Sequence, residues 1–256
     1  MIDLHCHLLP KVDDGPETLE ESIMLAKEAM KQGVTDILCS PHHRNGRYEN
    51  EKATVIRSVA DLQQELVKRR IPLNLLPGQE IRLTAELLTD LEQDKLLFVD
   101  PASAYLLIEF PTMSLLSYTQ ELFFQLRALG KVPIIVHPER NLKFRENPDL
   151  LLPYLEMGCL AQLTAPSLVG VYGKAIQKTT KEMLKRNLVQ MIASDAHGIH
   201  KRTFYLKESC EIIIKDYGTE KMDWMQQVAQ DIIRGQQLNY PSYLKKRKYW
   251  QFFKYN

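Results

Sequence analysis

Seven apolar runs of strand length recur along this chain of 256 residues, and segments of mixed polarity separate them. The runs are almost continuously apolar instead of alternating, which is typical of strands that are buried on both faces of a parallel sheet. The pattern predicts strands at residues 2–5, 35–41, 73–80, 104–111, 132–139, 160–167 and 189–197.

The segments between these runs carry the signals of helices. After the first run, Thr18 and Glu21 have the spacing of a capping box, and apolar residues recur at helical spacing from Leu19 to Met30. Gly33 stands where such a helix would end. Further helices are predicted at residues 49–70, 114–130, 149–158 and 172–187.

Strands and helices therefore alternate along the whole chain, with no low-complexity linker between the units. Seven such units favour one closed α/β barrel, so we expect a single domain over residues 1–256. An open doubly wound sheet is the alternative. Against that alternative, the first strand is not followed by a glycine-rich dinucleotide fingerprint, because Gly15 stands alone in "HCHLLPKVDDG".

The composition of the chain excludes only a few classes of function. A hydrophobic content of 45% supports a large core, and a formal net charge of +1 creates no overall field that would attract nucleic acid or an acidic membrane. There is no signal-peptide pattern, and no apolar run approaches membrane-spanning length. The four cysteines show no pairing rhythm, so we expect free thiols in a soluble cytoplasmic protein.

Residues 241–256 differ from the rest of the chain. This segment, "PSYLKKRKYWQFFKYN", holds five Lys or Arg residues and no acid, so the preceding body carries a net charge of −4 against +1 for the whole chain. It is also rich in aromatic residues. It could pack on the barrel, contact an anionic surface or dock a partner, and packing on the barrel is the interpretation we favour.

Histidines and carboxylates collect where the predicted strands end. Because the carboxyl ends of parallel strands form one face of such a fold, these side chains should converge although they lie far apart in sequence. A glutamate inside "LLIEF" is costly to bury unless it binds a metal or forms a salt bridge, and both remain possible for Glu109. The candidate ligands are His5, His7, Asp14, His42, Glu80, Glu109, His137, Asp195 and His197.

Nine candidate ligands exceed the four or so that one tetrahedral zinc ion uses, so they predict two or three metal ions. Mixed nitrogen and oxygen ligands without thiolates suit manganese, iron or zinc. Such a cluster produces a hydroxide nucleophile at neutral pH and attracts phosphate oxygens, which predicts phosphoester hydrolysis. Arg140 and Arg202 lie on the same loops and can hold phosphate, or they are ordinary surface arginines. His43 and Arg44 are weaker candidates, as proton donor or phosphate contact.

Five motifs in order, "DLHCH", "SPHH", "PGQE", "VHPER" and "SDAH", resemble the polymerase and histidinol phosphatase (PHP) superfamily, whose members build a trinuclear metal site on a distorted seven-stranded barrel. The longer stretches "HCHLLPKVDDGP", "CSPHHRNG" and "IVHPERN" resemble its bacterial protein-tyrosine phosphatase branch, which is associated with capsule and exopolysaccharide synthesis. The likeness covers residues 2 to about 202.

The resemblance implies a distorted TIM-like (β/α)7 barrel and manganese-dependent hydrolysis of phosphotyrosine on a bacterial tyrosine kinase and its phosphorylated substrates. All nine candidate ligands match the family pattern, with Glu109 where many relatives have histidine. A carboxylate there makes the cluster more anionic, which is consistent with manganese. Arg140 and Arg202 match the family's phosphate-binding arginines.

A check on mechanism is independent of the resemblance. Thiol-based tyrosine phosphatases need an arginine six residues after the reactive cysteine, so that a thiolate attacks within a phosphate-binding loop. That position holds Val12, Asn45, Ala165 or Asp216 after the four cysteines, so any tyrosine phosphatase activity must depend on metal. Cys6 alternates with two candidate ligands along the strand and is expected to be a core thiol.

Three alternatives remain open. A small-metabolite phosphatase of the histidinol phosphate type would share all nine ligands, and the loop at residues 44–51 would decide how open the pocket is. A 3′–5′ nuclease is disfavoured because the near-neutral chain lacks a basic groove. A non-catalytic, metal-stabilised binding module would contact the kinase through the basic aromatic segment.

Overall fold

The structure is a computed structural model that describes residues 1–200, 202–236 and 238. Its strands are β1 (Ile2–Cys6), β2 (Asp36–Cys39), β3 (His42–His43), β4 (Asn74–Pro77), β5 (Glu80–Arg82), β6 (Tyr105–Glu109), β7 (Val132–Val136), β8 (Leu160–Thr164) and β9 (Met191–Ala193). Its helices are α1 (Leu19–Lys31), α2 (Lys52–Lys68), α3 (Leu87–Glu92), α4 (Thr119–Ala128), α5 (Leu142–Glu146), α6 (Leu152–Glu156), α7 (Ala165–Val169), α8 (Lys174–Lys185), α9 (Leu206–Tyr217) and α10 (Thr219–Ile233), with short 3-10 helices η1 (Pro138–Arg140) and η2 (Pro148–Leu151).

The strands form two parallel sheets, in the orders β1-β2-β4 and β3-β5-β6-β7-β8-β9. The strand predicted at 35–41 corresponds to β2, with β3 following beyond its predicted end, and the strand predicted at 73–80 corresponds to β4 and the first residue of β5. Pro41 lies between β2 and β3 and cannot donate a ladder hydrogen bond. Gly78 lies between β4 and β5, where an added Cβ would meet side-chain carbons of Leu38 at 2.8–3.0 Å. The described residues therefore form nine strands where seven were predicted.

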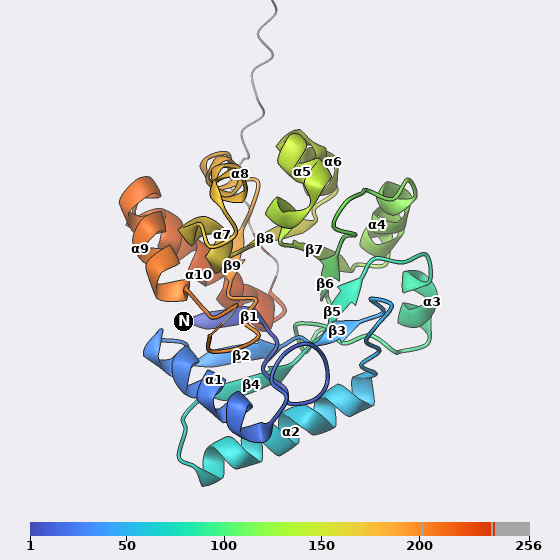
Figure 1. The fold of residues 1–256 in the computed structure, drawn as a ribbon. Coiled ribbons are helices and arrows are strands. Elements are labelled where there is room, and N and C mark those ends of the chain that lie inside the picture. Colours follow the sequence, from blue (N-terminus) through green and yellow to red (C-terminus); the bar gives the residue numbers. More distant parts are fainter. Residues whose placement is uncertain (201, 237, 239–256) are drawn as a thin grey trace, which may run out of the picture.

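The two sheets meet where β1 and β9 lie side by side (Figure 1). The His7 amide donates to the Ala196 carbonyl at 2.9 Å, and the Asp195 amide donates to the His5 carbonyl at 2.8 Å. A parallel bridge pairs Cys6 with Ala196. When β2 and β3, and likewise β4 and β5, are each counted as one interrupted strand, the strands follow one another in chain order. The predicted parallel α/β architecture is confirmed.

Alternate residues of the strands face an apolar interior at the amino-terminal ends of the strands. There, α10 packs against β1 and β9 and closes this end. The Tyr105 hydroxyl at the start of β6 donates to the Gln236 carbonyl just after α10, at 2.7 Å. We call this group the apolar interior cluster, and its buried members are Leu4, Leu38, Val99, Tyr105, Leu107, Ile134, Val136, Leu160, Met191, Val228, Ala229 and Ile232.

An irregularity in β1 sets which side chains of that strand reach the site. The pairing of β1 with β2 shifts register between Asp3 and Cys6. Such bulges redirect side chains, and here Leu4 joins the apolar interior cluster while the adjacent His5 faces Gln162 of β8. Cys6 is fully buried in the larger core between strands and helices, as expected of a core thiol.

The helices and strand ends correct several sequence expectations. The capping box of α1 is confirmed, with Thr18 and Glu21 bonded reciprocally. The strands predicted at 132–139 and 160–167 end earlier, because η1 begins at Pro138 and α7 begins at Ala165. The segment at 149–158 is divided between η2 and α6, and α9 and α10 were not expected.

The cysteines, the absence of a membrane-spanning helix among the described residues and the segment 241–256 were also subjects of prediction. All four cysteines are free, as predicted. Among the described residues, no helix is both long and apolar enough to cross a membrane. Residues 241–256 lie outside the described part of the chain, and the single-domain assignment stays a prediction.

Candidate metal centre and phosphate site

The carboxyl ends of the strands bring eight of the nine candidate ligands into three overlapping groups. Within each group, one potential ligand atom from every member lies within 4.8 Å of the others. His137, the ninth candidate, lies beside them with its Nε2 at 2.7 Å from Glu80 Oε1. The groups are His7, Asp14, His42 and His197; His5, His7, Glu80 and Asp195; and His42, Glu80 and Glu109. We call these nine residues the ligand cluster.

Glu80 lies at the centre of the ligand cluster and is fully buried. Its Oε2 lies 2.8 Å from His42 Nδ1 and 3.3 Å from His7 Nε2. The same oxygen is 3.4 Å from His5 Nε2. One carboxylate thus faces several imidazoles, an arrangement suited to bridging two cations.

Several buried polar atoms of the cluster have no hydrogen-bond partner. Buried polar atoms are nearly always paired, so a group of unpaired ones that face each other needs an explanation. All of these are nitrogen or oxygen atoms that can bind a divalent cation. The residues present therefore fit a metal site. These atoms are Glu80 Oε2 and His42 Nδ1, which lie 2.8 Å apart, His197 Nε2, which lies 3.2 Å from Asp14 Oδ1, and Glu109 Oε2, which forms an ion pair with Arg82 Nη2 at 2.9 Å.

Hydrogen bonds from outside the cluster orient its imidazoles. His7 Nδ1 lies 2.6 Å from Asp13 Oδ2, and His5 Nδ1 lies 2.9 Å from Gln162 Oε1. In each ring this directs Nε2 toward the cluster, as metal-binding histidines require. Sequence reasoning missed both orienting residues. The available signals were the second acid of "VDDG" and a glutamine inside the apolar run "LAQLT".

The loop that carries Asp13 and Asp14 folds closely over the end of β1. Asp13 accepts hydrogen bonds from the backbone amides of Gly15, at 3.0 Å, and His42, at 3.1 Å. A Cβ on Gly15 would lie 2.5 Å from the His7 carbonyl oxygen, so only glycine permits this approach. The turn thereby places Asp14 Oδ1 at 3.3 Å from His42 Nε2 and 3.2 Å from His197 Nε2.

Burial and neighbouring charge shift the pKa values of the cluster in opposite directions. Burial alone would lower the pKa of His42, but Glu80 and Asp14 outweigh it and raise that pKa to about 9. Burial lowers the pKa of His197 to about 4, helped by the positive charge of His7. Burial raises the pKa of Glu109 to about 7, and the Glu80 carboxylate adds to this shift. At neutral pH without a cation, His42 is therefore protonated, whereas His197 is neutral and offers a lone pair.

Two arginines border the cluster. Arg140 pairs with Asp195, and Arg202 lies 3.1 Å from Asp195 Oδ2 and 3.0 Å from Asp14 Oδ2. Burial alone would raise the pKa of Asp195, but both arginines outweigh it and hold that pKa well below its usual range. The side chains of Arg140 and Arg202 remain 30% and 28% exposed, so each can also reach an anion from solvent.

Left-handed backbone occurs at three points of this rim. His137, Asp195 and Arg202 have φ values of 35°, 51° and 52°. Residues other than glycine adopt this conformation at an energetic cost, and such positions cluster at functional sites. Tertiary packing thus holds two members of the ligand cluster and one arginine in directions that local preference disfavours.

The structure does not bring His43 and Arg44 to the cluster. Arg44 forms a two-pronged ion pair with Asp90, with Nε–Oδ2 and Nη2–Oδ1 distances of 2.8 and 2.7 Å. His43 follows His42 on β3 and so faces the opposite side of the strand. Burial lowers the pKa of His43, and the charge of Arg44 adds to this effect.

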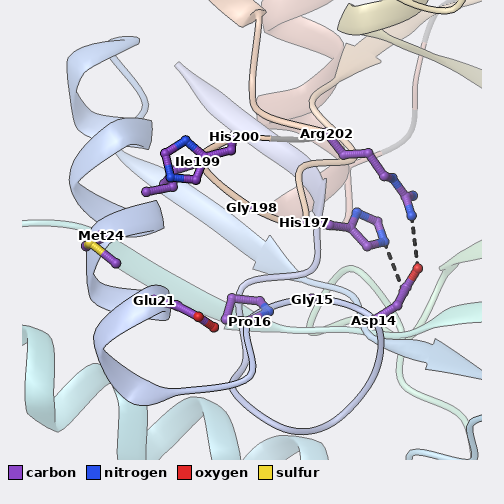
Figure 2. A pocket seen from close by; sticks show the side chains of 10 residues that line it. All are labelled: Asp14, Gly15, Pro16, Glu21, Met24, His197, Gly198, Ile199, His200 and Arg202. Carbon is purple, nitrogen blue, oxygen red and sulfur yellow. Dashed lines mark hydrogen bonds and ion pairs between the residues drawn. The ribbon is translucent and has the colours of Figure 1, made fainter.

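A cavity of about 420 Å³ opens beside the ligand cluster (Figure 2). Asp14, His197 and Arg202 line it on the side of the cluster. Side chains of α1 and of the loop after β9 line the rest, as Figure 2 shows for Met24 and Ile199. A substrate can therefore approach the cluster from this side.

Known proteins of similar sequence match most of this chain. Tyrosine-protein phosphatase YwqE of Bacillus subtilis (strain 168) is 40% identical over 255 residues, which are 99% of this chain and 100% of that protein. Putative tyrosine-protein phosphatase CapC of Staphylococcus aureus is 42% identical over 208 residues, 81% of each chain.

A solved structure shows the same fold. It comes from work on YwqE from Bacillus subtilis and CpsB from Streptococcus pneumoniae, described as unique metal-dependent tyrosine phosphatases. It is 39% identical, has a TM-score of 0.91 and covers 96% of this chain and 100% of its own. Residues 1–234 match the family described as "Capsular polysaccharide synthesis, CpsB/CapC". This chain therefore belongs to the CpsB/CapC family of capsular polysaccharide synthesis.

Proposed function

We propose that this protein is a manganese-dependent protein-tyrosine phosphatase that hydrolyses phosphotyrosine on a bacterial tyrosine kinase and its phosphorylated substrates. The observation that carries the proposal is the ligand cluster, in which buried imidazole nitrogens and carboxylate oxygens face one another within 4.8 Å and two arginines lie at the rim. Relatives that match nearly the whole chain are named tyrosine-protein phosphatases, which supports the same substrate class.

Different residues of the site would bind the metal ions, orient the metal-binding imidazoles and bind the phosphate. Two or three bound divalent ions would supply a nucleophile from water at neutral pH and positive charge for the phosphoryl oxygens. The nine residues of the ligand cluster would hold these ions, and Glu80, which faces His7 and His42, would contribute a carboxylate. Asp13 and Gln162 keep the His7 and His5 rings in position. Arg140 and Arg202 would each turn a guanidinium toward the phosphate, where planar donors match its oxygens.

Manganese is proposed from the chemistry of the ligands. The cluster offers imidazole nitrogens and carboxylate oxygens and no thiolate, because the nearby Cys6 belongs to the core. Hard oxygen ligands such as Glu80, Glu109 and Asp195 suit manganese, while iron and zinc remain compatible with the same set.

The cellular setting follows from the family. Membership in a capsular polysaccharide synthesis family supports a role in capsule or exopolysaccharide synthesis. The protein partner in this proposal is a phosphorylated tyrosine kinase. Four free cysteines suit a reducing compartment, so we assign the protein to the cytoplasm. His43 stays a candidate proton donor, although its place on β3 does not favour that role.

The test is an assay of chelator-treated protein with manganese, iron or zinc added back. A phosphotyrosine peptide and histidinol phosphate serve as substrates, and Arg140→Ala and His137→Ala are compared with Arg44→Ala, whose guanidinium is occupied by Asp90. We expect manganese-dependent release from the peptide that is lost in the first two variants only. Release from histidinol phosphate alone would assign a metabolite phosphatase. Bound metal without release from either substrate would favour a binding module.

A further inference from the structure

We propose that the cavity beside the ligand cluster binds the phenyl ring of the phosphotyrosyl residue, and that Met24 and Ile199 form the walls that select it. This inference rests on the proposed function and adds to it the part of the molecule that distinguishes tyrosine from serine phosphate. It assigns a substrate-binding role to an exposed methionine of α1.

The position of the cavity defines what can enter it. Within the ligand cluster, Asp14 has the most exposed side chain, at 37%, whereas those of Glu80 and Asp195 are fully buried. A phosphate therefore reaches the cluster on the side of Asp14 and the neighbouring Arg202. Asp14, Arg202 and His197 also line the cavity, so the group esterified to that phosphate extends into it (Figure 2).

The walls beyond the phosphate side include apolar surface suited to an aromatic ring. Met24 lies on α1, Ile199 on the loop after β9, and Pro16 on the loop before α1, and all three line the cavity (Figure 2). A thioether beside an aromatic ring makes a favourable contact, and burial of the ring adds to it. The volume of about 420 Å³ is large enough for a phenyl ring, which is far smaller than a drug-sized ligand.

The side chain of Met24 has no place in the core. It is 44% exposed, while its neighbours Ile23 and Leu25 are buried at 1% and 0%. The charged wall residue on the same helix, Glu21, is held by the capping box, with Oε2 accepting from the backbone amides of Glu17 and Thr18 at 2.7 and 3.2 Å. The carboxylate of Glu21 is thus engaged by backbone amides, and Met24 supplies the apolar surface on that side of the cavity.

This arrangement explains a preference for tyrosine phosphate. Phosphotyrosine places a ring between the ester oxygen and its Cβ, so the ring can contact Met24 and Ile199 while the phosphate lies at the cluster. Phosphoserine carries its ester oxygen directly on Cβ and brings no ring into the cavity. The apolar walls therefore stabilise binding of only the aryl ester.

The test compares Met24→Gln and Ile199→Gln with Ile56→Gln in metal-loaded protein. Glutamine is neutral and favours helix, and Ile56 is a matched control because it lies on α2 with the same exposure of 44%. The probes are phenyl phosphate, a phosphotyrosine peptide, a phosphoserine peptide of the same sequence, and inorganic phosphate as an inhibitor.

We expect each cavity variant to raise KM for phenyl phosphate and the phosphotyrosine peptide by about three- to tenfold, the size of one lost sulfur or apolar contact. Ile56→Gln should leave both unchanged, and Met24→Leu should retain most of the wild-type affinity. The inhibition constant of inorganic phosphate and the low activity on phosphoserine should not change.

Three results would overturn the inference. The first is an unchanged KM for phenyl phosphate in both cavity variants. The second is an equal loss on phosphate and on aryl esters, which would indicate damage to the cluster. The third is an effect confined to the peptide, which would assign the cavity to a residue flanking the phosphotyrosine. Failure of the proposed function is separate, because the wild-type protein would then release no phosphate from phosphotyrosine with any of the metals.

Discussion

The two ends of the strand interior contrast sharply in chemistry although the same strands build both. On β6, the inward residues Tyr105 and Leu107 belong to the apolar interior cluster, and the next inward residue, Glu109, belongs to the ligand cluster. Likewise, Met191 on β9 belongs to the apolar interior cluster, and Asp195 just after β9 belongs to the ligand cluster. One end therefore stabilises the fold by burying apolar surface, and the other buries carboxylates whose charge arginines and imidazoles balance in part.

Replacing the central carboxylate would test the polar end most severely. Glu80→Gln removes the charge that faces several imidazoles, so we expect metal-dependent hydrolysis to fall by about 10²–10³-fold. The rise in melting temperature that added metal produces in the wild type should also disappear, because ligand binding stabilises only a protein that binds it. Metal content and thermal unfolding with and without chelator measure this, and wild-type metal content in the variant would contradict it.

A large-to-small substitution at the apolar end should lower stability and leave the activity nearly unchanged. Ile232→Ala, in the helix that closes this end, should lower the free energy of unfolding by about 2–5 kcal/mol. Below the melting temperature, kcat/KM should stay within a factor of about two, because the ligand cluster is untouched. Urea unfolding measures the loss.

The matched control is Ile214→Ala on α9, whose side chain is 43% exposed and should change the free energy of unfolding by less than about 0.5 kcal/mol. Equal losses in the two variants would show that α10 does not close the interior.

Substitution of two arginines compares the rim of the ligand cluster with the surface outside it. Arg140→Ala should lower kcat/KM by about a hundredfold, because its guanidinium lies against Asp195 and remains open to solvent. Arg44→Ala should change kcat/KM only a few-fold at most, since Asp90 occupies that guanidinium away from the cluster. Steady-state kinetics on a phosphotyrosine peptide compare the two, and similar losses would place Arg44 in the phosphate site.

The smallest effect should come from an orienting residue. Asp13→Asn weakens the hydrogen bond to His7 Nδ1 without removing any candidate ligand, so metal affinity should fall by about tenfold. Titration with metal in the presence of a competing chelator measures this. Asp90→Asn, a buried carboxylate that pairs with Arg44, serves as the control and should leave the affinity unchanged.

Much of the fold could be predicted because its signals are local. Apolar runs indicated buried parallel strands, and the capping box at Thr18 marked the start of α1. The helices α9 and α10 escaped prediction, although α10 closes the apolar end. Apolar residues recur at helical spacing in α10, from Met222 to Ile232, so its pattern was available, but its place against β1 and β9 depends on tertiary packing.

For the site, the sequence by itself determined the inventory: histidines and carboxylates at strand ends, and no cysteine with an arginine six residues beyond it. Only the tertiary structure decided which of them converge. Register between distant strands, the irregularity in β1 and left-handed backbone at His137 and Asp195 set the direction of each side chain. The pairing of Arg44 with Asp90 was likewise decided by the tertiary structure, because these residues lie 46 positions apart and no local pattern encodes their contact.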